Sequence, residues 1–212
     1  MKKSGSNSVP DKSRLIIETA SRLFSRRGYF ETKMSDIARE AGIAVGTIYL
    51  YYANKDDLRA GIYQYSSETL LNRIENRSAG ETDPLDKFTV YLEESIAYSF
   101  EHPDLFLIVF VDFQRMEIQS PRRLFFSNYR KYIALGESVL EEGQGKGIFR
   151  FSASAASLIL GITAMWAALV LRKVLDPHFK ADEITKAEIL SLVRTTVLEG
   201  ILAGPARSPA EV

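Results

Sequence analysis

Residues 32–55 read TKMSDIAREAGIAVGTIYLYYANK, and this stretch decides the fold of the N-terminal part of the chain. Apolar residues from Ile37 to Ala41 recur at helical spacing, and Gly42 then supplies the sharp turn that ends the helix. A second short helix is expected over residues 45–52. Two helices joined by a tight glycine turn form a helix-turn-helix, whose second helix enters the major groove of DNA.

The second helix of this pair has one inward face. Ile48 and Tyr52 are four residues apart and are expected to point into the core. The glycine at position 46 lets the backbone approach a base edge or phosphate, and Lys55 adds a cation at the start of the following helix. The candidate DNA-binding residues on the exposed side and ends are Val45, Gly46, Thr47, Tyr49, Leu50, Tyr51 and Lys55.

Capping residues predict the ends of the neighbouring helices. A helix beginning at Asp11 should stop at Gly28, after two arginines that favour its C-terminal end. Thr32 is expected to cap the next helix. Asn54 should cap a long fourth helix, with Asp57 completing an imperfect capping box.

The rest of the chain also reads as helical. Further helices are expected at about 85–101, 103–117, 121–142, 152–175 and 182–202, with glycines 143, 145 and 147 breaking the chain before 152. No period-2 run predicts a strand. The fold class is therefore all-α, with about nine helices. The expected divisions are a flexible tail (1–10), a DNA-binding domain (11–55), a helical ligand-binding and dimerisation domain (56–205) and a second flexible tail (206–212).

Charge and cysteine content restrict the function classes. Residues 1–55 hold ten lysines and arginines against five acidic residues, and the remaining residues carry a matching negative excess because the chain is neutral overall. This asymmetry indicates either a polyanion-binding N-terminal part or plain solvated charge, with equal weight. The chain has no cysteine and a polar N-terminus without a signal peptide, so we expect it in the cytoplasm.

An uncharged stretch lies at residues 153–171, long enough to suggest a membrane span. Polar residues interrupt it and the other helices are amphipathic, so we favour a buried helix of a soluble protein over a membrane span. One face of this helix would pack in its own chain and another in a dimer interface. Small residues recur along it at the spacing of a seam between helices. The predicted dimer interface comprises Ser157, Gly161, Ala164, Ala168, Leu190, Val193, Val197 and Ile201.

Aromatic residues are concentrated between the N-terminal part and that bundle. Each one singly is best explained as core, but together they favour a cavity for a small hydrophobic or aromatic effector. A lone acid within an apolar segment, Asp112, either reaches solvent or Arg115, or serves as a polar anchor. The candidate pocket comprises Tyr91, Tyr98, Phe106, Phe110, Asp112, Phe113, Phe125, Tyr129 and Trp166.

Signatures of catalysis or of a cofactor are missing from the sequence. His102 and His178 are isolated loop residues beside prolines, and no metal-ligand spacing occurs. The glycines from 143 to 147 follow no strand, so they are not a phosphate-binding loop. We therefore expect a protein that is not an enzyme and needs no metal or other cofactor.

The N-terminal residues also resemble a known family. Thr32, Ile37–Ala38, Ala41–Gly42–Ile43, Gly46–Thr47, Tyr49, Tyr51–Tyr52, Lys55 and Leu58 resemble the TetR/AcrR family of bacterial transcriptional regulators, over residues 12–60. The resemblance implies an all-α homodimer that usually represses transcription and leaves DNA when a small molecule binds. It also implies DNA contacts by Thr32, Gly46, Thr47, Tyr49, Tyr51 and Lys55. Ala44 and Val45 depart from the family pattern, because Ser or Thr is common at the first position and a polar or basic residue at the second.

The sequence hypothesis is a ligand-responsive repressor that binds a palindromic operator as a homodimer. An activator of the same family is a variant that sequence does not distinguish. Two other classes stay open: a small-molecule-binding helical protein with a vestigial DNA-binding part, and a membrane-associated helical protein.

Overall fold

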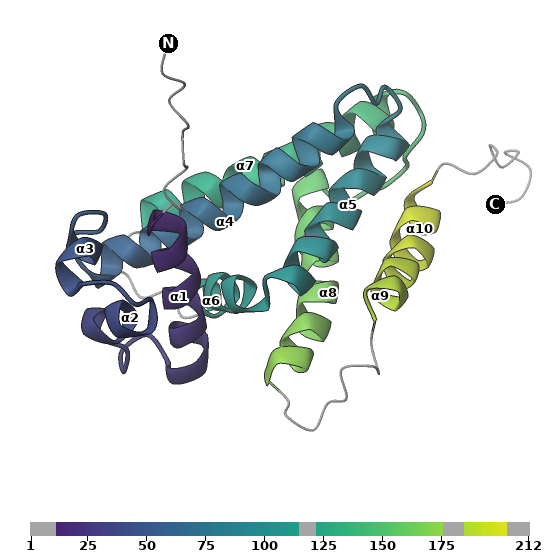
Figure 1. Ribbon diagram of the computed structural model, residues 1–212. Coiled ribbons are helices and arrows are strands. Elements are labelled where there is room, and N and C mark those ends of the chain that lie inside the picture. The colour runs from purple at the N-terminus through teal and green to yellow at the C-terminus, as the bar shows by residue number, and fades with distance from the viewer. Residues whose placement is uncertain (1–11, 115–121, 176–184, 203–212) are drawn as a thin grey trace, which may run out of the picture. The chain divides into compact units, whose positions relative to one another are not determined.

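The computed structural model describes residues 12–114, 122–175 and 185–202, and over these ranges the chain is helical with no named strand (Figure 1). The described residues fall into two compact units. The first holds those up to Ser66 and those of Asp104–Phe125, and the second holds Ser67–Pro103 and those from Phe126 onward. The all-α prediction is confirmed. The two predicted tails and His178 lie outside the described residues.

The first unit contains α1 (Lys12–Arg27), α2 (Met34–Glu40), α3 (Val45–Tyr49), the beginning of α4 (Lys55–Ser78) and most of α6 (Pro103–Gln114). Its core takes one apolar face from each short helix, which is why helices too short to persist alone are ordered here. The fully buried side chains of this core are Ile16, Ala20, Ile37, Ile48, Leu58 and Ile62. Ser25 on α1 donates a hydrogen bond to Asp104 on α6 at 2.5 Å.

Two helix caps were predicted in this unit, and only one is confirmed. Asn54 accepts a hydrogen bond from the Asp57 amide at 2.8 Å, and Asp57 accepts one from the Ala53 amide at 2.9 Å. The cap by Thr32 is wrong. Lys33 is the N-cap residue of α2, and its amide is bonded by the Asp36 side chain at 3.1 Å.

The second unit contains the rest of α4, with α5 (Pro84–Glu101), most of α7 (Arg122–Gly145), α8 (Ala155–Leu175) and α9 (Lys186–Val193). A ladder of aromatic rings forms its core. Phe88 and Tyr91 are stacked at 5.9 Å, Tyr91 and Tyr132 at 4.9 Å, and Phe88 meets Phe149 edge-on at 5.8 Å between ring centroids. Offset and edge-on pairs are the arrangements that aromatic quadrupoles favour.

Charged side chains join α4 to α5 within this unit. Glu94 accepts from Arg73 at 2.8 Å and from Arg77 at 2.9 Å, and Arg73 also reaches Glu101 at 2.5 Å. Arg77 makes a further ion pair with Glu93. Glu94 is largely buried, so its carboxylate depends on both guanidinium groups for partners. The hydrogen bond from Arg73 lowers the pKa of Glu101 from its ordinary value.

The last helix departs from the predicted α pattern. After α9 the chain forms a π-helical segment, η1 (Arg194–Leu198), and a final turn, α10 (Glu199–Ile201). A π segment inserts an extra residue into the turn, so the residues after it shift to another face. Leu198 is buried as a result, while Val197 is only half-buried. Beyond η1, the Arg150 amide donates to the Ile201 carbonyl at 2.7 Å.

Glycines near the end of α7 differ in their role. The predicted break at Gly143 is wrong, because α7 continues to Gly145, and Gly147 is the first of the three to have a positive φ, at 71°. A Cβ at Gly143 would overlap the ring of Phe149, whereas a Cβ at Gly145 would meet nothing within 4 Å. Gly143 is therefore required by close packing and Gly145 is not.

Alanine substitution should separate these two glycines. Gly143→Ala should lower the free energy of unfolding by about 1–3 kcal/mol through overpacking against Phe149, despite a helix-propensity gain of about 1 kcal/mol. Gly145→Ala is the matched control and should leave stability unchanged or slightly higher. Thermal and urea unfolding followed by circular dichroism measure both. Equal stability of the two variants would contradict the assigned packing.

Candidate nucleic-acid interface

The turn between α2 and α3 sets the position of the second helix. Gly42 has φ of 67°, which lies in the left-handed region that glycine adopts without strain. The Ile43 amide donates to the Ala38 carbonyl at 3.0 Å and the Gly42 amide to that of Arg39 at 3.2 Å. These two bonds are those of a Schellman motif, which ends α2 and redirects the chain. The glycine turn predicted from the sequence is confirmed.

α3 ends at Tyr49, so the predicted end at residue 52 is wrong. Two side chains fix α3 and the turn after it against the core, as predicted. Ile48 is fully buried and Tyr52 is 9% exposed. The Tyr52 hydroxyl is also hydrogen-bonded to Ser13 on α1 at 2.8 Å. Because α3 itself has only five residues, these inward contacts are what hold it in place.

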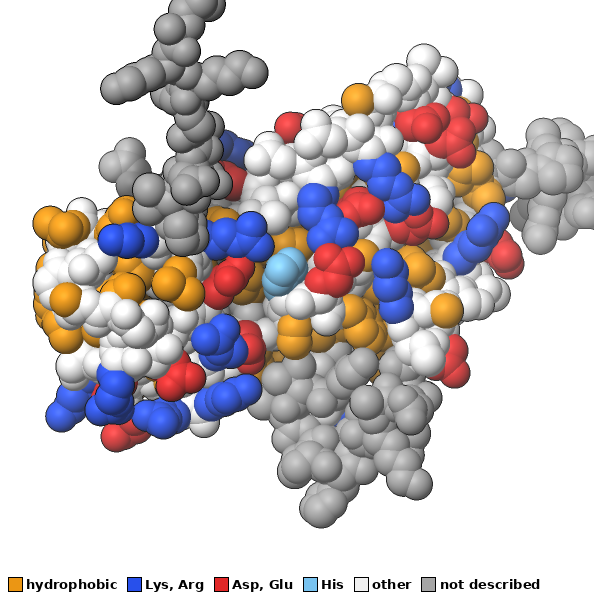
Figure 2. All heavy atoms as spheres, in the orientation of Figure 1, with side chains coloured by type: hydrophobic (Ala, Val, Ile, Leu, Met, Phe, Trp, Pro, Cys, Tyr) orange, Lys and Arg blue, Asp and Glu red, His pale blue; other side chains and the backbone are white. Residues whose placement is uncertain are grey.

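The outer surface of α3 and of the turn after it, residues 50–51, is exposed and mostly apolar (Figure 2). Leu50 is 84% exposed and Tyr49 51%. Gly46 is open, since a Cβ there would meet nothing within 4 Å. No side chain caps the helix at its N-cap residue, Ala44. The exposed members of the predicted set are Val45, Gly46, Tyr49, Leu50 and Tyr51, and Thr47 is half-buried.

Thr32 is placed differently from the prediction. Its side chain is fully buried, and its hydroxyl donates to the Gly28 carbonyl at 2.9 Å. A hydroxyl that is buried and bonded inside the chain does not contact a phosphate in this arrangement. The role of the Thr32 side chain is to close the connection between α1 and α2.

Lys55 is also engaged within the chain. Its ammonium donates to the backbone carbonyls of Tyr29 at 2.8 Å, Thr32 at 3.0 Å and Phe30 at 3.3 Å. It lies 4.4 Å from the centroid of the Tyr29 ring. Burial lowers the pKa of Lys55 from its ordinary value. Because an ammonium has three N–H donors, no donor is left over for a DNA phosphate.

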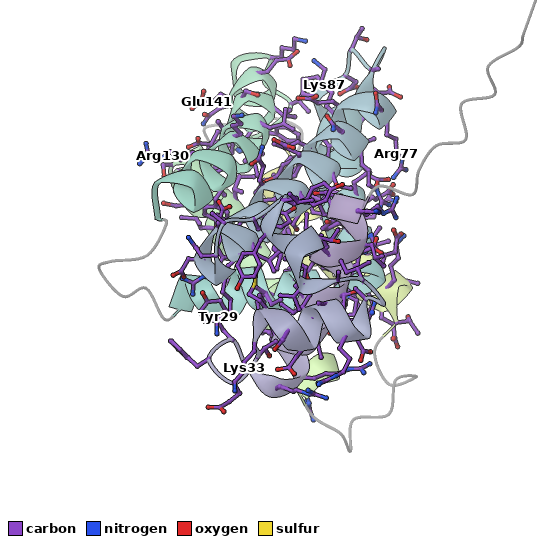
Figure 3. All side chains as sticks on the ribbon, turned by 60° about the vertical axis from the view of Figure 1, so that its left-hand side comes forward. Tyr29, Lys33, Arg77, Lys87, Arg130 and Glu141 are labelled. Carbon is purple, nitrogen blue, oxygen red and sulfur yellow. The ribbon has the colours of Figure 1, made fainter. Side chains whose placement is uncertain are left out.

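Other cations of the first unit are exposed and were missed as candidates. Lys33 is the N-cap of α2 and Arg39 lies in its last turn, and both side chains are solvent-accessible. Arg39 forms an ion pair with Asp36 at 2.7 Å. Figure 2 shows basic side chains gathered near α2, below the apolar surface of α3, and Figure 3 labels Lys33 near Tyr29. The sequence pointed to these cations only through the excess of positive charge in residues 1–55. That excess does not indicate which of the lysines and arginines face DNA.

The predicted pocket residues of the second unit lie in or beside the aromatic core. Tyr91, Tyr98 and Trp166 are buried. The Tyr91 hydroxyl donates to the Tyr132 carbonyl at 3.3 Å. Burial raises the pKa of Tyr129 to about 12, so this phenol stays neutral. Phe106 is half-buried in the first unit, and the side chains of Phe110, Asp112, Phe113 and Phe125 lie outside the described part.

The indole of Trp166 has an unusual environment. Its side chain is 2% exposed, yet its Nε1 donor has no hydrogen-bond partner among the described residues. An unpaired buried N–H costs about 1–3 kcal/mol, and such groups in native proteins call for an explanation.

The predicted dimer residues divide into two groups. Ser157, Gly161, Ala164 and Ala168 are all exposed on one face of α8, together with Leu160 at 43%. On the last helix, Val193 and Ile201 are buried inside the chain, and Leu190 and Val197 are half-buried. Val193 and Ile201 therefore pack in this chain's own core instead of facing a partner. The exposed apolar side chain of α9 is Leu192, at 40%.

A cavity of about 260 Å³ lies in the second unit beside α5, α9 and η1. Its lining mixes apolar side chains with one acid and one base. The lining residues are Thr89, Leu92, Glu93, Leu190, Ser191, Val193, Arg194 and Leu198. Sequence reasoning did not find this cavity, because the π segment that forms part of its wall leaves no mark in the hydrophobic pattern.

Within the described ranges, α8 is the single helix with the length and composition of a membrane span, over Ala155–Arg172. A third of that window is buried inside the chain. One such helix is weak evidence for a membrane, since core helices have the same composition.

Comparison with known proteins identifies the class. Residues 16–62, which form the helix-turn-helix and its flanking helices, match the family described as "Bacterial regulatory proteins, tetR family". The chain is thus a DNA-binding transcriptional regulator with a helical C-terminal part. Its residues 16–62 carry the DNA-binding domain of the TetR family, as the resemblance in the sequence implied.

Individual relatives agree with this assignment. The fatty acid metabolism regulator protein of Bacillus subtilis (strain 168) is 23% identical over 132 residues, covering 62% of this chain and 68% of the relative. The solved ketosteroid transcriptional regulator KstR2 of Mycobacterium tuberculosis has a TM-score of 0.74 at 21% identity, covering 92% of this chain and 97% of that one. AibR in complex with isovaleryl coenzyme A and operator DNA has a TM-score of 0.71 at 20% identity, covering 87% and 97%. At these identities the solved structures establish a common fold.

Adding a methyl group at Gly46 should test whether the exposed surface of α3 contacts DNA. Gly46→Ala meets no atom of the free protein, and alanine raises helix propensity by up to about 1 kcal/mol. Stability should therefore be unchanged or higher, while operator affinity should fall about tenfold or more if the backbone approaches DNA here. Gly145→Ala is the matched control. Gel shifts with the DNA flanking the gene measure both, and wild-type binding by Gly46→Ala would contradict a close approach.

Proposed function

We propose that the protein is a homodimeric repressor that binds a palindromic operator and releases it when a small hydrophobic ligand binds. The observation that carries the proposal is the exposed surface of α3 and of the turn after it, where Leu50 and two tyrosines face solvent while Ile48 anchors the helix. An exposed apolar group of this size on a rigid helix is typical of a contact surface.

The surface suits direct contact with DNA. Thr47 can hydrogen-bond a base edge or phosphate, and Leu50 can pack on a thymine methyl group. The hydroxyls of Tyr49 and Tyr51 are suited to phosphate oxygens. Lys33 and Arg39 add exposed positive charge at the two ends of α2. This division assigns base contacts to α3 and electrostatic attraction to α2.

The geometry of recognition supports a dimer. A five-residue helix covers few bases, so two copies on adjacent half-sites, about one helical turn apart, supply affinity and specificity. The exposed face of α8 supports a dimer, because its small residues, with Leu160 among them, let a second helix approach closely. We place the partner's α8 on this face and leave Val193 and Ile201 as internal support.

The second unit supports a proposal about the chemical class of the effector. Its aromatic core suits an apolar molecule, and Trp166 offers an unpaired buried N–H, which binds only an acceptor. We therefore propose an apolar effector carrying a carbonyl or another oxygen acceptor. The acyl part of the isovaleryl coenzyme A in the AibR complex and the ketosteroid in the name of KstR2 fit that class. Trp166 is the only tryptophan in the sequence, so its fluorescence can report binding in a compound screen.

Release would act through α4. This helix contributes residues to both units, so a ligand that shifts its later turns moves its first turn as well. In a dimer, such a shift changes the spacing of the two recognition helices, and the operator half-sites no longer match both. The DNA-binding regulator would reside in the cytoplasm with its operator.

The test of the proposed function is binding to the DNA that flanks the gene, by gel shift and footprinting over a salt series. We expect a two-fold symmetric footprint, and an observed affinity that falls steeply with salt because phosphate contacts release counterions. An effector from the fluorescence screen should abolish the footprint. Lack of salt-sensitive binding there and in a genomic selection would rule out the repressor proposal.

A charge on the α8 face should prevent dimerisation. Ala164→Glu introduces a carboxylate at an exposed position, so the single chain should fold normally while the dimer dissociates because the charge is buried unpaired. Light scattering should give a monomer, and operator affinity should fall by about a hundredfold or more. Ala134→Glu, at an exposed alanine on α7, is the matched control. A dimeric Ala164→Glu protein would place the interface elsewhere.

A further inference from the structure

The connection between α1 and α2, residues 28–33, is fastened to the first turn of α4 by several contacts. The ammonium of Lys55 bonds the three carbonyls of Tyr29, Phe30 and Thr32. The Tyr29 hydroxyl donates to Asp56 at 2.7 Å, and the guanidinium of Arg59 lies 4.2 Å from the Tyr29 ring centroid. Figure 3 labels Tyr29 beside the ribbon of this part of the chain.

We propose that Lys55 is a positioning residue for DNA binding, which holds the connection in place instead of contacting a phosphate. The inference deepens the proposed function and rests on operator binding. Its basis is the complete use of the ammonium: three donors meet three carbonyl oxygens, at 2.8–3.3 Å. A phosphate could be bonded only by giving up one of these carbonyls.

The fastened connection leads directly into the DNA-facing part of α2. Thr32 is held at two points, because its carbonyl accepts from Lys55 and its hydroxyl donates to Gly28. The next residue, Lys33, is the N-cap of α2 and has an exposed cationic side chain. Holding Thr32 therefore fixes where Lys33 and the N-terminus of α2 lie relative to the first turn of α4.

Lysine chemistry fits this task better than arginine chemistry. Three carbonyls converging on one atom match the three N–H bonds of a compact ammonium. The planar guanidinium of arginine spreads its donors over a fork and suits a phosphate instead. Replacing Lys55 by Arg retains the charge and removes the fit, so this substitution distinguishes the two roles.

The experiment measures operator affinity of Lys55→Arg and Lys55→Gln over a salt series. We expect both variants to lose about tenfold or more in affinity, with the slope of log affinity against log salt unchanged from wild type. A phosphate-binding Lys55 predicts the opposite: Lys55→Arg keeps wild-type affinity, and Lys55→Gln makes the slope shallower by about 0.9 for each phosphate that is no longer neutralised. Either of those results would overturn the proposal. Lys131→Arg, at an exposed lysine of α7, is the matched control and keeps wild-type affinity.

A second measurement locates the effect in the connection. Amide hydrogen exchange of residues 28–33 should be faster in Lys55→Arg without DNA, while exchange in α5 and α8 and the unfolding temperature of the second unit stay unchanged. Tyr29→Phe removes the hydroxyl that bonds Asp56 and serves if a Lys55 variant is unstable, with a smaller affinity loss at unchanged slope. Unaltered exchange at 28–33 would refute the positioning role. Failure of wild-type protein to bind the operator would instead refute the proposed function.

Discussion

The position of the exposed surface of α3, which we propose contacts DNA, depends on the burial of Ile48. A helix of five residues closes too few hydrogen bonds to persist alone, and α3 lacks a side-chain cap at Ala44. Its order is therefore entirely tertiary: Ile48 inserts into the core formed by α1, α2 and α4, and Tyr52 adds a hydrogen bond to Ser13. Every exposed side chain on α3 takes its direction from that one anchor.

The helix-turn-helix could be predicted from sequence because its determinants are local. Gly42, the apolar spacing on α2 and the pair Ile48 and Tyr52 each act within a few residues of where they are read. The capping of α4 by Asn54 is local too. The boundaries that were wrong have non-local causes: Gly143 stays helical because the ring of Phe149 packs against it from outside α7.

Site residues were harder to predict, for the same reason. Thr32 and Lys55 are polar residues at positions that suit DNA contact. The sequence gives no sign that their side chains already donate hydrogen bonds to backbone carbonyls. Their partners lie in a connection without regular structure, between 4 and 26 residues away. Tyr49, Leu50 and Tyr51 were easier to place outward, because the inward face of α3 was already assigned. A residue's availability for a ligand thus depends on bonds that no local pattern records.

The π segment Arg194–Leu198 also fixes the end of the described chain. Helical residues advance by about 100° each, so the one extra residue in this turn determines which way the following residues face. In the observed register the Ile201 carbonyl meets the Arg150 amide, and Leu202 pairs with Phe149. Deleting a single residue from the segment would restore an ordinary α-helix and rotate α10 by that angle. The backbone pairing between Leu202 and Phe149 would then be lost. Phe149, which packs against α7, would lose this backbone support. The extra residue of the π segment thus determines whether the C-terminal end of the described chain pairs with Phe149 of the aromatic core.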